Sequence, residues 1–308
     1  MLFSKKTLSA IFSFSLIASQ SSAAILTVNN HLEHYAPSTI LATDTVVFTS
    51  SGSFTGHAGT QVNNYGQVIM EAGTVVTYEA GSSYTSYEES YVLNDIDVIN
   101  NGIFDIQAGS TVNGSGSFTQ VNGGSIIVNG TVNLGSVNIL GSGYLGGSGT
   151  INGNVYAAGS DVIINSGNSP GTLTVNGNLH VEDGAKIILE IGDLGHDTLQ
   201  VSGNFEIEDG TDIVFKFLDG FDETILETFE LTDFFEATSE DVNDPAPALD
   251  LSLFSTMNFG FQSDTNEIVA LNLGSNGQIT QVSEPTTFAL LLLGLSGLAF
   301  QRKRLASQ

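Results

Sequence analysis

A short internal repeat runs through the middle of this chain. A Gly or Ser, a Thr and an apolar residue recur at 73–75, 110–112, 130–132, 149–151 and 171–173. The steps between copies are 37, 20, 19 and 22 residues, and the first step is close to the sum of two of the others. A longer match supports this period, because residues 66–73 align with residues 102–109 at an offset of 36. A period of about 20 residues is the length of one coil of a β-solenoid.

A second repeat has a wider spacing. Residues 175–184 match residues 201–210 at an offset of 26. Each copy continues into an alternating run, at 187–191 and 213–217, and alternation places apolar side chains on one face of a strand. Each copy ends in Glu-Asp-Gly. This predicts a hairpin or the corner of a coil, with Gly supplying a positive φ.

These patterns predict an all-β fold, and within that class a β-solenoid. The apolar runs are short, the turns are rich in Asn and Gly, and the repeat is local along the chain. Each coil of a solenoid buries its inward side chains against its neighbours. No helical period is evident between residues 25 and 261, which argues against an α/β fold. A Greek-key β-sandwich stays open as the alternative.

One stretch adds a family likeness to this fold prediction. Residues 167–178 read Gly-Asn-Ser-Pro-Gly-Thr-Leu-Thr-Val-Asn-Gly-Asn. The stretch resembles the passenger repeats of autotransporter-like surface proteins, and the likeness extends more loosely over residues 102–220. The resemblance implies a right-handed parallel β-helix and an extracellular location. It does not imply autotransport, because only one short apolar span follows in place of the family's outer-membrane barrel.

Charge and cysteine content narrow the function classes. All acidic residues except Glu284 lie within residues 25–283, whereas only Lys186 and Lys216 of the basic residues do, which gives this span a net charge of −30. Nucleic acid needs a basic footprint, so no nucleic-acid partner is expected. The charge favours solubility and association with cations, although an acidic solvated surface explains most of it. With no Cys, stability must come from packing or bound cations.

The N-terminus has the three parts of a secretory signal peptide. Lys5 and Lys6 form a basic region, residues 8–18 are apolar, and Ala23 and Ala24 supply small residues at the cleavage site. We therefore expect signal peptidase to process the chain and the mature protein to begin near Ile25.

The C-terminus has three parts in a fixed order. Ser283-Glu284-Pro285 precedes an uncharged apolar run over residues 286–300, and Arg302, Lys303 and Arg304 follow as a basic cluster. As a helix, the run rises about 22 Å, which is short of the roughly 30 Å hydrocarbon core. Such a helix would hold loosely, as suits a temporary anchor, and the basic cluster favours the cytoplasmic side.

This tail resembles the PEP-CTERM sorting signal of Gram-negative bacteria, with Ser283 in place of that family's first Pro. The resemblance implies recognition by an exosortase-type membrane protease, cleavage near Ser283, and release or attachment outside the cell. Before processing, the C-terminal transmembrane helix would hold the chain in the inner membrane. An ordinary tail anchor is the alternative.

These segments define four regions along the chain. We assign residues 1–24 to the signal peptide and residues 25–220 to the solenoid body. Residues 221–281 form a C-terminal β cap with an acidic loop and spacer, and residues 282–304 form the sorting signal with its transmembrane helix.

Few residue patterns suggest catalysis. Glu206 and Glu208 alternate with apolar residues and project from one face of a strand, at a separation of about 6.6 Å. Inverting glycosidases use a similar spacing, but a solvated face is the simpler explanation. The glycine pattern at 141–146 and the Gly-x-Ser-x-Gly pattern at 167–171 both need a following helix. Gly-rich or strand-like sequence follows instead, so we read neither as a site.

Three clusters contain residue types that ligate cations. They are Asp193, His196 and Asp197; His31, Glu33 and His34; and Glu182-Asp183 together with Glu208-Asp209. The third set could hold calcium between adjacent coils through carboxylate oxygens. No established calcium-binding loop is present, so no cofactor is predicted and structural calcium stays open.

The expected function is a non-enzymatic, exported protein of the cell surface or extracellular matrix. Association with exopolysaccharide or a biofilm comes from the PEP-CTERM likeness, because that family often occurs in exopolysaccharide-producing bacteria, and from no residue of this chain. The alternatives are a β-helix glycoside hydrolase using the paired carboxylates, and a calcium-dependent adhesin.

Overall fold

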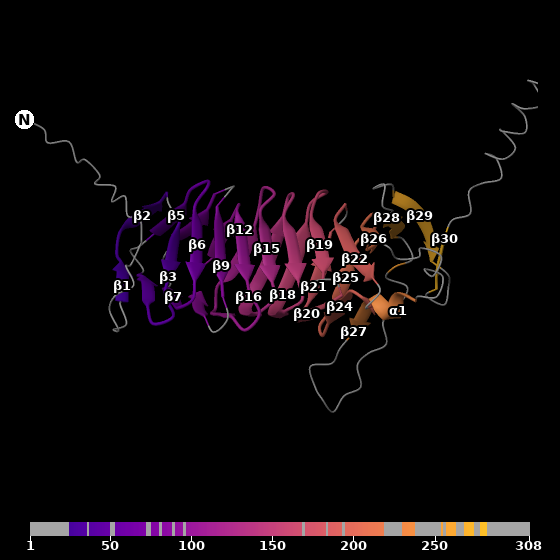
Figure 1. Cartoon of the computed structure of the whole chain (residues 1–308). Helices are drawn as coiled ribbons and strands as arrows, with labels where there is room; N and C mark the ends of the chain where they lie inside the picture. The colour runs from indigo at the N-terminus through magenta and orange to yellow at the C-terminus, as the bar shows by residue number, and fades with distance from the viewer. Residues whose placement is uncertain are drawn as a thin grey trace, which may run out of the picture.

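The chain forms an elongated parallel β-solenoid (Figure 1). The computed structural model describes residues 25–35, 37–49, 53–71, 75–79, 82–87, 90–94, 97–167, 170–182, 184–192, 195–218, 230–237, 254, 257–262, 268–273 and 278–281. Coils stack along one axis, and neighbouring coils are joined by parallel ladders (Figure 1). The solenoid prediction is therefore confirmed, and the β-sandwich alternative is wrong.

Three ladders run the length of the solenoid. The first contains β1 (Ile25–Val28), β4 (Thr45–Phe48), β7 (Gln67–Met70), β10 (Tyr91–Asn94), β13 (Thr111–Asn113), the first halves of β16 (Thr131–Leu140) and β18 (Thr150–Ala158), β20 (Thr172–Asn176), β24 (Thr198–Val201) and β27 (Phe235–Ala237). The second contains β2 (His31–His34), β5 (Ser53–Gly56), β8 (Val75–Tyr78), β11 (Asp97–Asn100), β14 (Ser117–Gln120), the second halves of β16 and β18, β21 (Leu179–Val181) and β25 (Phe205–Ile207). The third contains β3 (Ser38–Ile40), β6 (Gln61–Asn64), β9 (Ser83–Ser86), β12 (Ile103–Ile106), β15 (Ser125–Val128), β17 (Tyr144–Gly147), β19 (Ile163–Ser166), β22 (Lys186–Gly192), β26 (Asp212–Phe217) and β28 (Asn258–Gln262).

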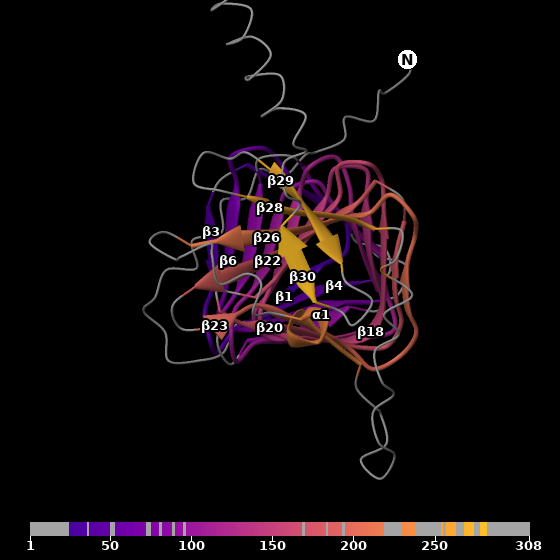
Figure 2. The same ribbon diagram turned by 90° about the vertical axis from the view of Figure 1, so that its right-hand side faces the viewer.

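The C-terminal end departs from this parallel path. β29 (Ile268–Leu273) pairs antiparallel with β28, and β30 (Ile279–Gln281) pairs antiparallel with β29. With the short helix α1 (Leu231–Phe234), these strands lie across the end that faces the viewer in Figure 2. Two aromatic pairs pack beneath them, Phe215 with Phe234 and Phe235 with Phe254, at centroid distances of 4.7 and 4.9 Å. All four rings are buried, at 1% exposure or less.

The core is the lumen enclosed by the three ladders. Successive side chains of a strand point to opposite faces, so every second residue points inward, as the buried and half-buried alternation of β14 illustrates. The largest fully buried side chains are Phe104, Phe118, Phe215, Phe234, Phe235, Phe254, Ile106, Ile126, Ile139, Leu145, Ile151 and Ile164. Each coil thus covers the inward side chains of its neighbours, and burial of apolar area stabilises the stack.

The 20-residue repeat marks true coil register in the centre of the chain. Thr111 pairs with Thr131, and Thr131 pairs with Thr150. The next predicted copy is displaced, because Thr150 pairs with Thr174 rather than with Thr172. A shift of two residues keeps every side chain on its side of the strand, so the sequence pattern does not distinguish the two registers.

The first repeat step and the 36-residue match are wrong as coil register. Val75 begins β8 in the second ladder, whereas Thr111 begins β13 in the first. Likewise β7 belongs to the first ladder and β12 to the third. In all three ladders, inward-facing and outward-facing residues alternate along each strand. A motif that opens a strand in one ladder can therefore recur in a different ladder.

The 26-residue repeat is confirmed strand by strand. Val175 pairs with Val201, Leu179 with Phe205, and Ile187 with Ile213. The second copy, Glu208-Asp209-Gly210, forms a coil corner rather than a hairpin, because β25 and β26 on either side of it pair in different parallel ladders. Gly184 and Gly210 have φ values of 82° and 88° at these corners, a conformation that favours Gly.

A ladder of asparagine side chains runs along the outside of the first ladder of strands. The Asn133 amide donates to Asn113 Oδ1 at 2.6 Å, Asn152 donates to Asn133, and Asn176 donates to Asn152 at 2.7 Å. Each inner Asn therefore donates to one coil and accepts from the next.

We expect Asn133→Ala to lower the free energy of unfolding by about 1–2 kcal/mol, because it removes two partly exposed hydrogen bonds. Asn176→Ala removes one bond of this ladder and should cost about half as much. Urea denaturation of both variants measures the difference. Equal losses would show that the ladder does not contribute through its hydrogen bonds.

Candidate functional site

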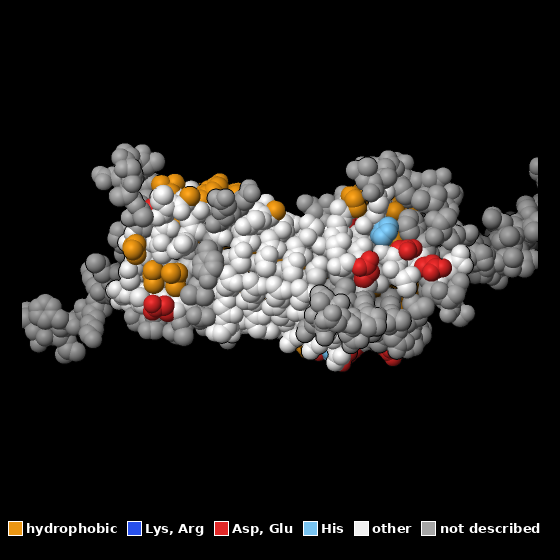
Figure 3. All heavy atoms as spheres, turned by 90° about the horizontal axis from the view of Figure 1, so that it is seen from below, with side chains coloured by type: hydrophobic (Ala, Val, Ile, Leu, Met, Phe, Trp, Pro, Cys, Tyr) orange, Lys and Arg blue, Asp and Glu red, His pale blue; other side chains and the backbone are white. Residues whose placement is uncertain are grey.

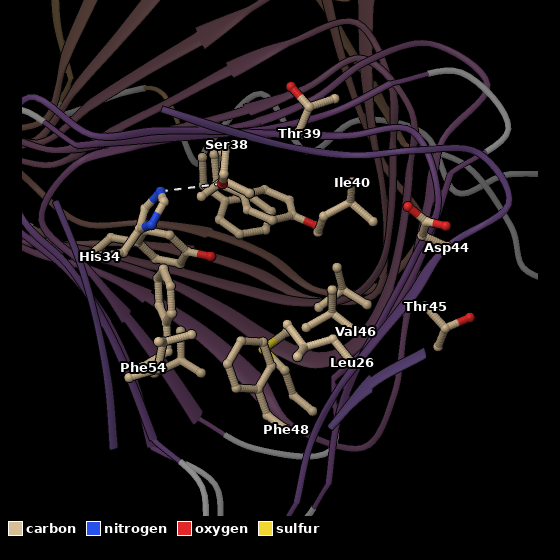
Figure 4. A pocket seen from close by; sticks show the side chains of 18 of the residues that line it. Leu26, His34, Ser38, Thr39, Ile40, Asp44, Thr45, Val46, Phe48 and Phe54 are labelled. Atoms are coloured by element: carbon tan, nitrogen blue, oxygen red, sulfur yellow. Dashed lines mark hydrogen bonds between the residues drawn. The ribbon is translucent and has the colours of Figure 1, made fainter. Parts of the chain in front are cut away.

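The most site-like feature is a cavity in the lumen at the N-terminal end, with a volume of about 160 Å³ (Figure 4). Its wall is formed by Ile25, Leu26, Leu32, His34, Ser38, Thr39, Ile40, Asp44, Thr45, Val46, Phe48, Phe54, Val62, Val68, Met70, Val76, Tyr78, Tyr84 and Phe104. Ile25 is 73% exposed, whereas Phe104 is 1% exposed, so the cavity reaches from the surface into the buried lumen. At the C-terminal end of the lumen, aromatic rings pack against one another instead.

His34 is the polar group set deepest in this apolar wall. Its side chain is 1% exposed, and one ring nitrogen, Nε2, lies 3.2 Å from Ser38 Oγ (Figure 4). The other ring nitrogen, Nδ1, is buried without a hydrogen-bond partner among the described residues. Burial lowers the pKa of His34, and a contact with the Gln61 backbone partly offsets this effect. The imidazole is therefore held in its neutral form at neutral pH.

The predicted cluster of His31, Glu33 and His34 is not brought together as a cation site. Glu33 lies outside the coil, where Tyr35 donates a hydrogen bond to it at 2.7 Å. His34 points inward, next in alternation to the buried Leu32. The strand thus separates the two side chains, and the side chain of His31 lies outside the described part of the structure.

The paired carboxylates lie on the outer surface of β25 and its following corner. His180 Nδ1 is 2.8 Å from Glu206 Oε2, and His180 Nε2 is 3.4 Å from Glu208 Oε1. The two carboxylate side chains are 59% and 50% exposed. An inverting glycosidase places its carboxyl groups on opposite sides of the scissile bond. Here both groups meet the same imidazole from one surface, a geometry that an ion pair between coils explains.

Asp197 is a buried carboxylate whose role the sequence did not indicate. It is 0% exposed and accepts hydrogen bonds from the backbone N–H groups of Gly171 and Glu190 at 3.1 and 3.0 Å. Burial raises its pKa to about 6, and the charge of Glu190 adds to this, while the two backbone donors and Lys216 oppose it. The carboxylate joins β22 to the segment that precedes β20, so its role here is architectural.

The cation clusters are not assembled in the described part of the structure. Among those residues, no group of three or more His, Asp or Glu side chains is placed to hold a metal ion. Asp183 and Asp193, which belong to two of the predicted clusters, lie outside them. His196 packs its ring against Phe234 at 4.8 Å, while the neighbouring Asp197 binds backbone.

Both glycine patterns lead into strands. The turn at Gly141 is followed by β17, and residues 167–171 are followed by β20, so neither precedes the helix that its chemistry requires. Ser169 lies outside the described residues.

The predicted export residues also lie outside the described residues. These are the cleavage site at Ala23 and Ala24, the sorting motif Ser283, Glu284 and Pro285, and the basic cluster Arg302, Lys303 and Arg304. The apolar run at 286–300 belongs to the same part of the chain. No helix within the described ranges is long and apolar enough to cross a membrane.

Charge on the outer surface is uneven. The chain carries no Asp, Glu, Lys or Arg from residue 106 to residue 160, which covers β13 to β18 in the centre of the solenoid. In the view from below, acidic side chains lie toward the two ends and the middle is uncharged (Figure 3). The acidic solvated surface expected from the composition is therefore interrupted over the central coils, which carry no Asp or Glu.

Sequence reasoning missed the cavity and the inward direction of His34. The signal was the alternation of β2, where Leu32 and His34 share parity. An inward Leu therefore requires an inward His.

Comparison with known proteins gave no match among family models, curated proteins or solved structures.

Proposed function

We propose that this chain is an exported, non-enzymatic protein of the cell surface or extracellular matrix. In this proposal the solenoid is a rod that presents its outer faces for association. The chain is sorted through its C-terminal signal and associates with exopolysaccharide. The right-handed coiling and the C-terminal transmembrane helix belong to the same proposal.

The observation that carries it is the regular outer surface of the central coils. Thr and Asn side chains recur at equivalent positions from coil to coil, as in the pairs Thr111 with Thr131 and Asn113 with Asn133. Parallel strands place such rows about 4.8 Å apart. A long, uncharged surface of hydroxyl and amide groups offers many hydrogen bonds to a neutral polymer.

The termini support the exported location. The basic, apolar and small-residue order around Lys5, Lys6 and Ala24 suits a signal peptide. The tail from Ser283 to Arg304 suits a temporary membrane stop. The absence of Cys means that folding outside the cytoplasm needs no disulfide formation.

Fractionation of the native host tests the sorting step. Three forms, each with an epitope tag in an exposed loop, are compared: the full chain, a chain ending at Gln281, and a full-length Glu284→Ala, Pro285→Ala variant. We expect the full chain outside the cell, shortened at its C-terminus. The truncated form should remain in the periplasm, and the double variant should remain uncleaved in the inner membrane.

The double variant separates sorting from simple anchoring, because it keeps the apolar run and Arg302 to Arg304. If the full chain also stays intact in the inner membrane, the tail is a plain anchor. The surface and matrix function is then wrong.

A further inference from the structure

The outer surface of the first ladder carries a regular array of two side-chain types. In β13, β16, β18 and β20, a Thr and an Asn flank a buried apolar residue. Each Thr pairs in register with the next Thr, and each Asn with the next Asn; the members of this Thr/Asn array are Thr111, Thr131, Thr150, Thr174, Asn113, Asn133, Asn152 and Asn176. The residues between them are at most 1% exposed: Val112, Val132, Ile151 and Val175. The array side chains therefore all lie on the outside of the solenoid.

Folding alone does not account for this uniformity. The same four coils present a second outer face on the second ladder. There the equivalent outward positions hold four different residue types, which are Thr119, Asn138, Tyr156 and His180. Those strands pair in register as well, so a coil of this solenoid does not need the same residue at each outward position. The repetition on the first ladder therefore points to a partner that is itself periodic.

The array is held rigidly and keeps hydrogen-bonding groups for water. The Asn amides bond from coil to coil, at 2.6 Å from Asn133 to Asn113 and at 2.7 Å from Asn176 to Asn152. An amide has two N–H donors and two acceptor lone pairs, so an inner Asn keeps one donor and one acceptor for solvent. A Thr hydroxyl group also donates and accepts, and the Thr side chain is stiff. Groups that are already ordered bind without paying the entropy of ordering them.

The dimensions and charge of the array fit the surface of ice. Neighbouring strands lie about 4.8 Å apart, and the Thr and Asn of one strand are about 6.6 Å apart. Water oxygens on a prism face of hexagonal ice repeat at similar intervals in two perpendicular directions. None of the four strands contains Asp, Glu, Lys or Arg, and the middle of the solenoid is uncharged in the view from below (Figure 3). An uncharged surface suits ice, because ice solvates ions poorly.

We propose that the Thr/Asn array is an ice-binding surface. Its hydroxyl and amide groups hold a first layer of water in lattice positions, and the Thr methyl groups lie between them. Ordered water can bridge two surfaces almost as well as a direct hydrogen bond. Adsorbed chains force the ice front to curve between them, which lowers the freezing temperature of a crystal and not its melting temperature. This activity goes beyond the surface role proposed above and does not depend on it.

Thermal hysteresis of the chain purified from its native host tests the activity. A single seed crystal is cooled and warmed slowly in the protein solution. We expect its freezing temperature to fall below its melting temperature and its faces to become shaped. A solute that does not bind ice lowers both temperatures equally. In parallel, the chain is labelled with a fluorophore on its amino groups, and it should adsorb to the surface of a growing ice crystal.

A matched pair of variants tests the location. Thr131 lies within the array and Thr119 lies on the second ladder, and both are half-buried and point outward. Thr131→Tyr places a bulky ring in the array and should abolish thermal hysteresis and adsorption. Thr119→Tyr should leave both unchanged. Circular dichroism and melting temperature establish that each variant is folded, and Thr150→Tyr replaces Thr131→Tyr if that variant does not fold.

Two results would overturn the inference. The first is a folded parent chain that neither separates the two temperatures nor adsorbs to ice. The second is an equal loss in the Thr131→Tyr and Thr119→Tyr variants, or no loss in either, because the array would then not be the binding surface. A chain that binds neutral exopolysaccharide but not ice refutes this inference alone and leaves the proposed function in place.

Discussion

Replacing Phe118 with Ala is expected to lower the free energy of unfolding by about 3–5 kcal/mol. Phe118 lies on β14, is 0% exposed, and its ring centroid is 4.5 Å from that of Phe104. Phe104 in turn stacks on Tyr84 at 4.5 Å. The substitution removes the last ring of an interior row that runs from Tyr84 through Phe104 to Phe118, and the closed coils around it cannot collapse to fill the space.

The next residue on the same strand is the control. Thr119 is half-exposed on the outside of the coil, where Asn138 donates a weak hydrogen bond to its hydroxyl at 3.3 Å. We expect Thr119→Ala to cost less than about 1 kcal/mol. Chemical denaturation of the two variants, side by side, measures the contrast. Equal losses would contradict the assignment of inward and outward faces.

A solenoid adds a second readout for Phe118→Ala. Each coil contacts only its neighbours, so stability is close to a sum of coil and interface contributions. A defect in one coil should therefore lower protection from hydrogen exchange most strongly in β11, β14 and β16, which pair directly. Uniform loss of protection along the whole rod would instead indicate that the solenoid unfolds as a single unit.

Burial pattern and local register could be predicted from the sequence, because both depend on neighbouring residues. The alternation in strands such as β16 and β20 is visible as period-2 hydrophobicity. The match of Val175 to Val201 gave coil register at 26 residues, since every position of that repeat has an equivalent role. These features are set locally, and the structure confirms them.

Assignment to a ladder could not be predicted in the same way. β7 and β12 look alike in sequence, yet they lie in different ladders. What separates them is the geometry of the corners between strands, and corner residues were not distinctive enough to fix it. Coil length also varies. In the first ladder, Thr150 pairs with Thr174, which is 24 residues on, and Leu199 pairs with Phe235, which is 36 residues on.

The roles of buried polar residues could not be predicted from the sequence either. Asp197 was grouped with Asp193 and His196 as a cation ligand because carboxylate and imidazole groups are close in sequence there. In the structure, β23 (Gly195–His196) pairs antiparallel with the end of β22, so the chain folds back and Asp197 meets the Glu190 backbone. Such a reversal inside a parallel ladder leaves no periodic signal in the sequence.

Asp197→Ala is expected to lower the free energy of unfolding at pH 7 by about 2–4 kcal/mol. The change leaves the buried N–H groups of Gly171 and Glu190 without the acceptor that each now has, and each unpaired group costs about 1–3 kcal/mol. Glu206→Ala is the matched control. It removes a carboxylate that is 59% exposed, and an exposed ion pair contributes little, so its cost should stay below about 1 kcal/mol.

The pH dependence gives an independent test through Asp197→Asn. The pKa of Asp197 is raised from 3.8 to about 6 in the folded protein, so the folded state binds this proton more tightly than the unfolded state does. The resulting stability is fully present below pH 3.8 and is lost as pH rises through about 6. Relative to the Asn variant, which does not titrate, the parent should therefore lose up to about 3 kcal/mol between pH 4 and pH 7.

The charged and titratable groups around Asp197 define what this comparison must hold constant. Lys216 and Glu190 form an ion pair at 2.5 Å beside it, Tyr144 interacts electrostatically with all three, and the His196 ring lies next in the chain. All of these remain in the Asn variant, so their titration cancels in the difference. Urea denaturation of both proteins at pH 4, 5, 6 and 7 measures it. A difference that is constant with pH, or that grows in favour of the parent as pH rises, would show that the pKa of Asp197 is not raised in the folded protein.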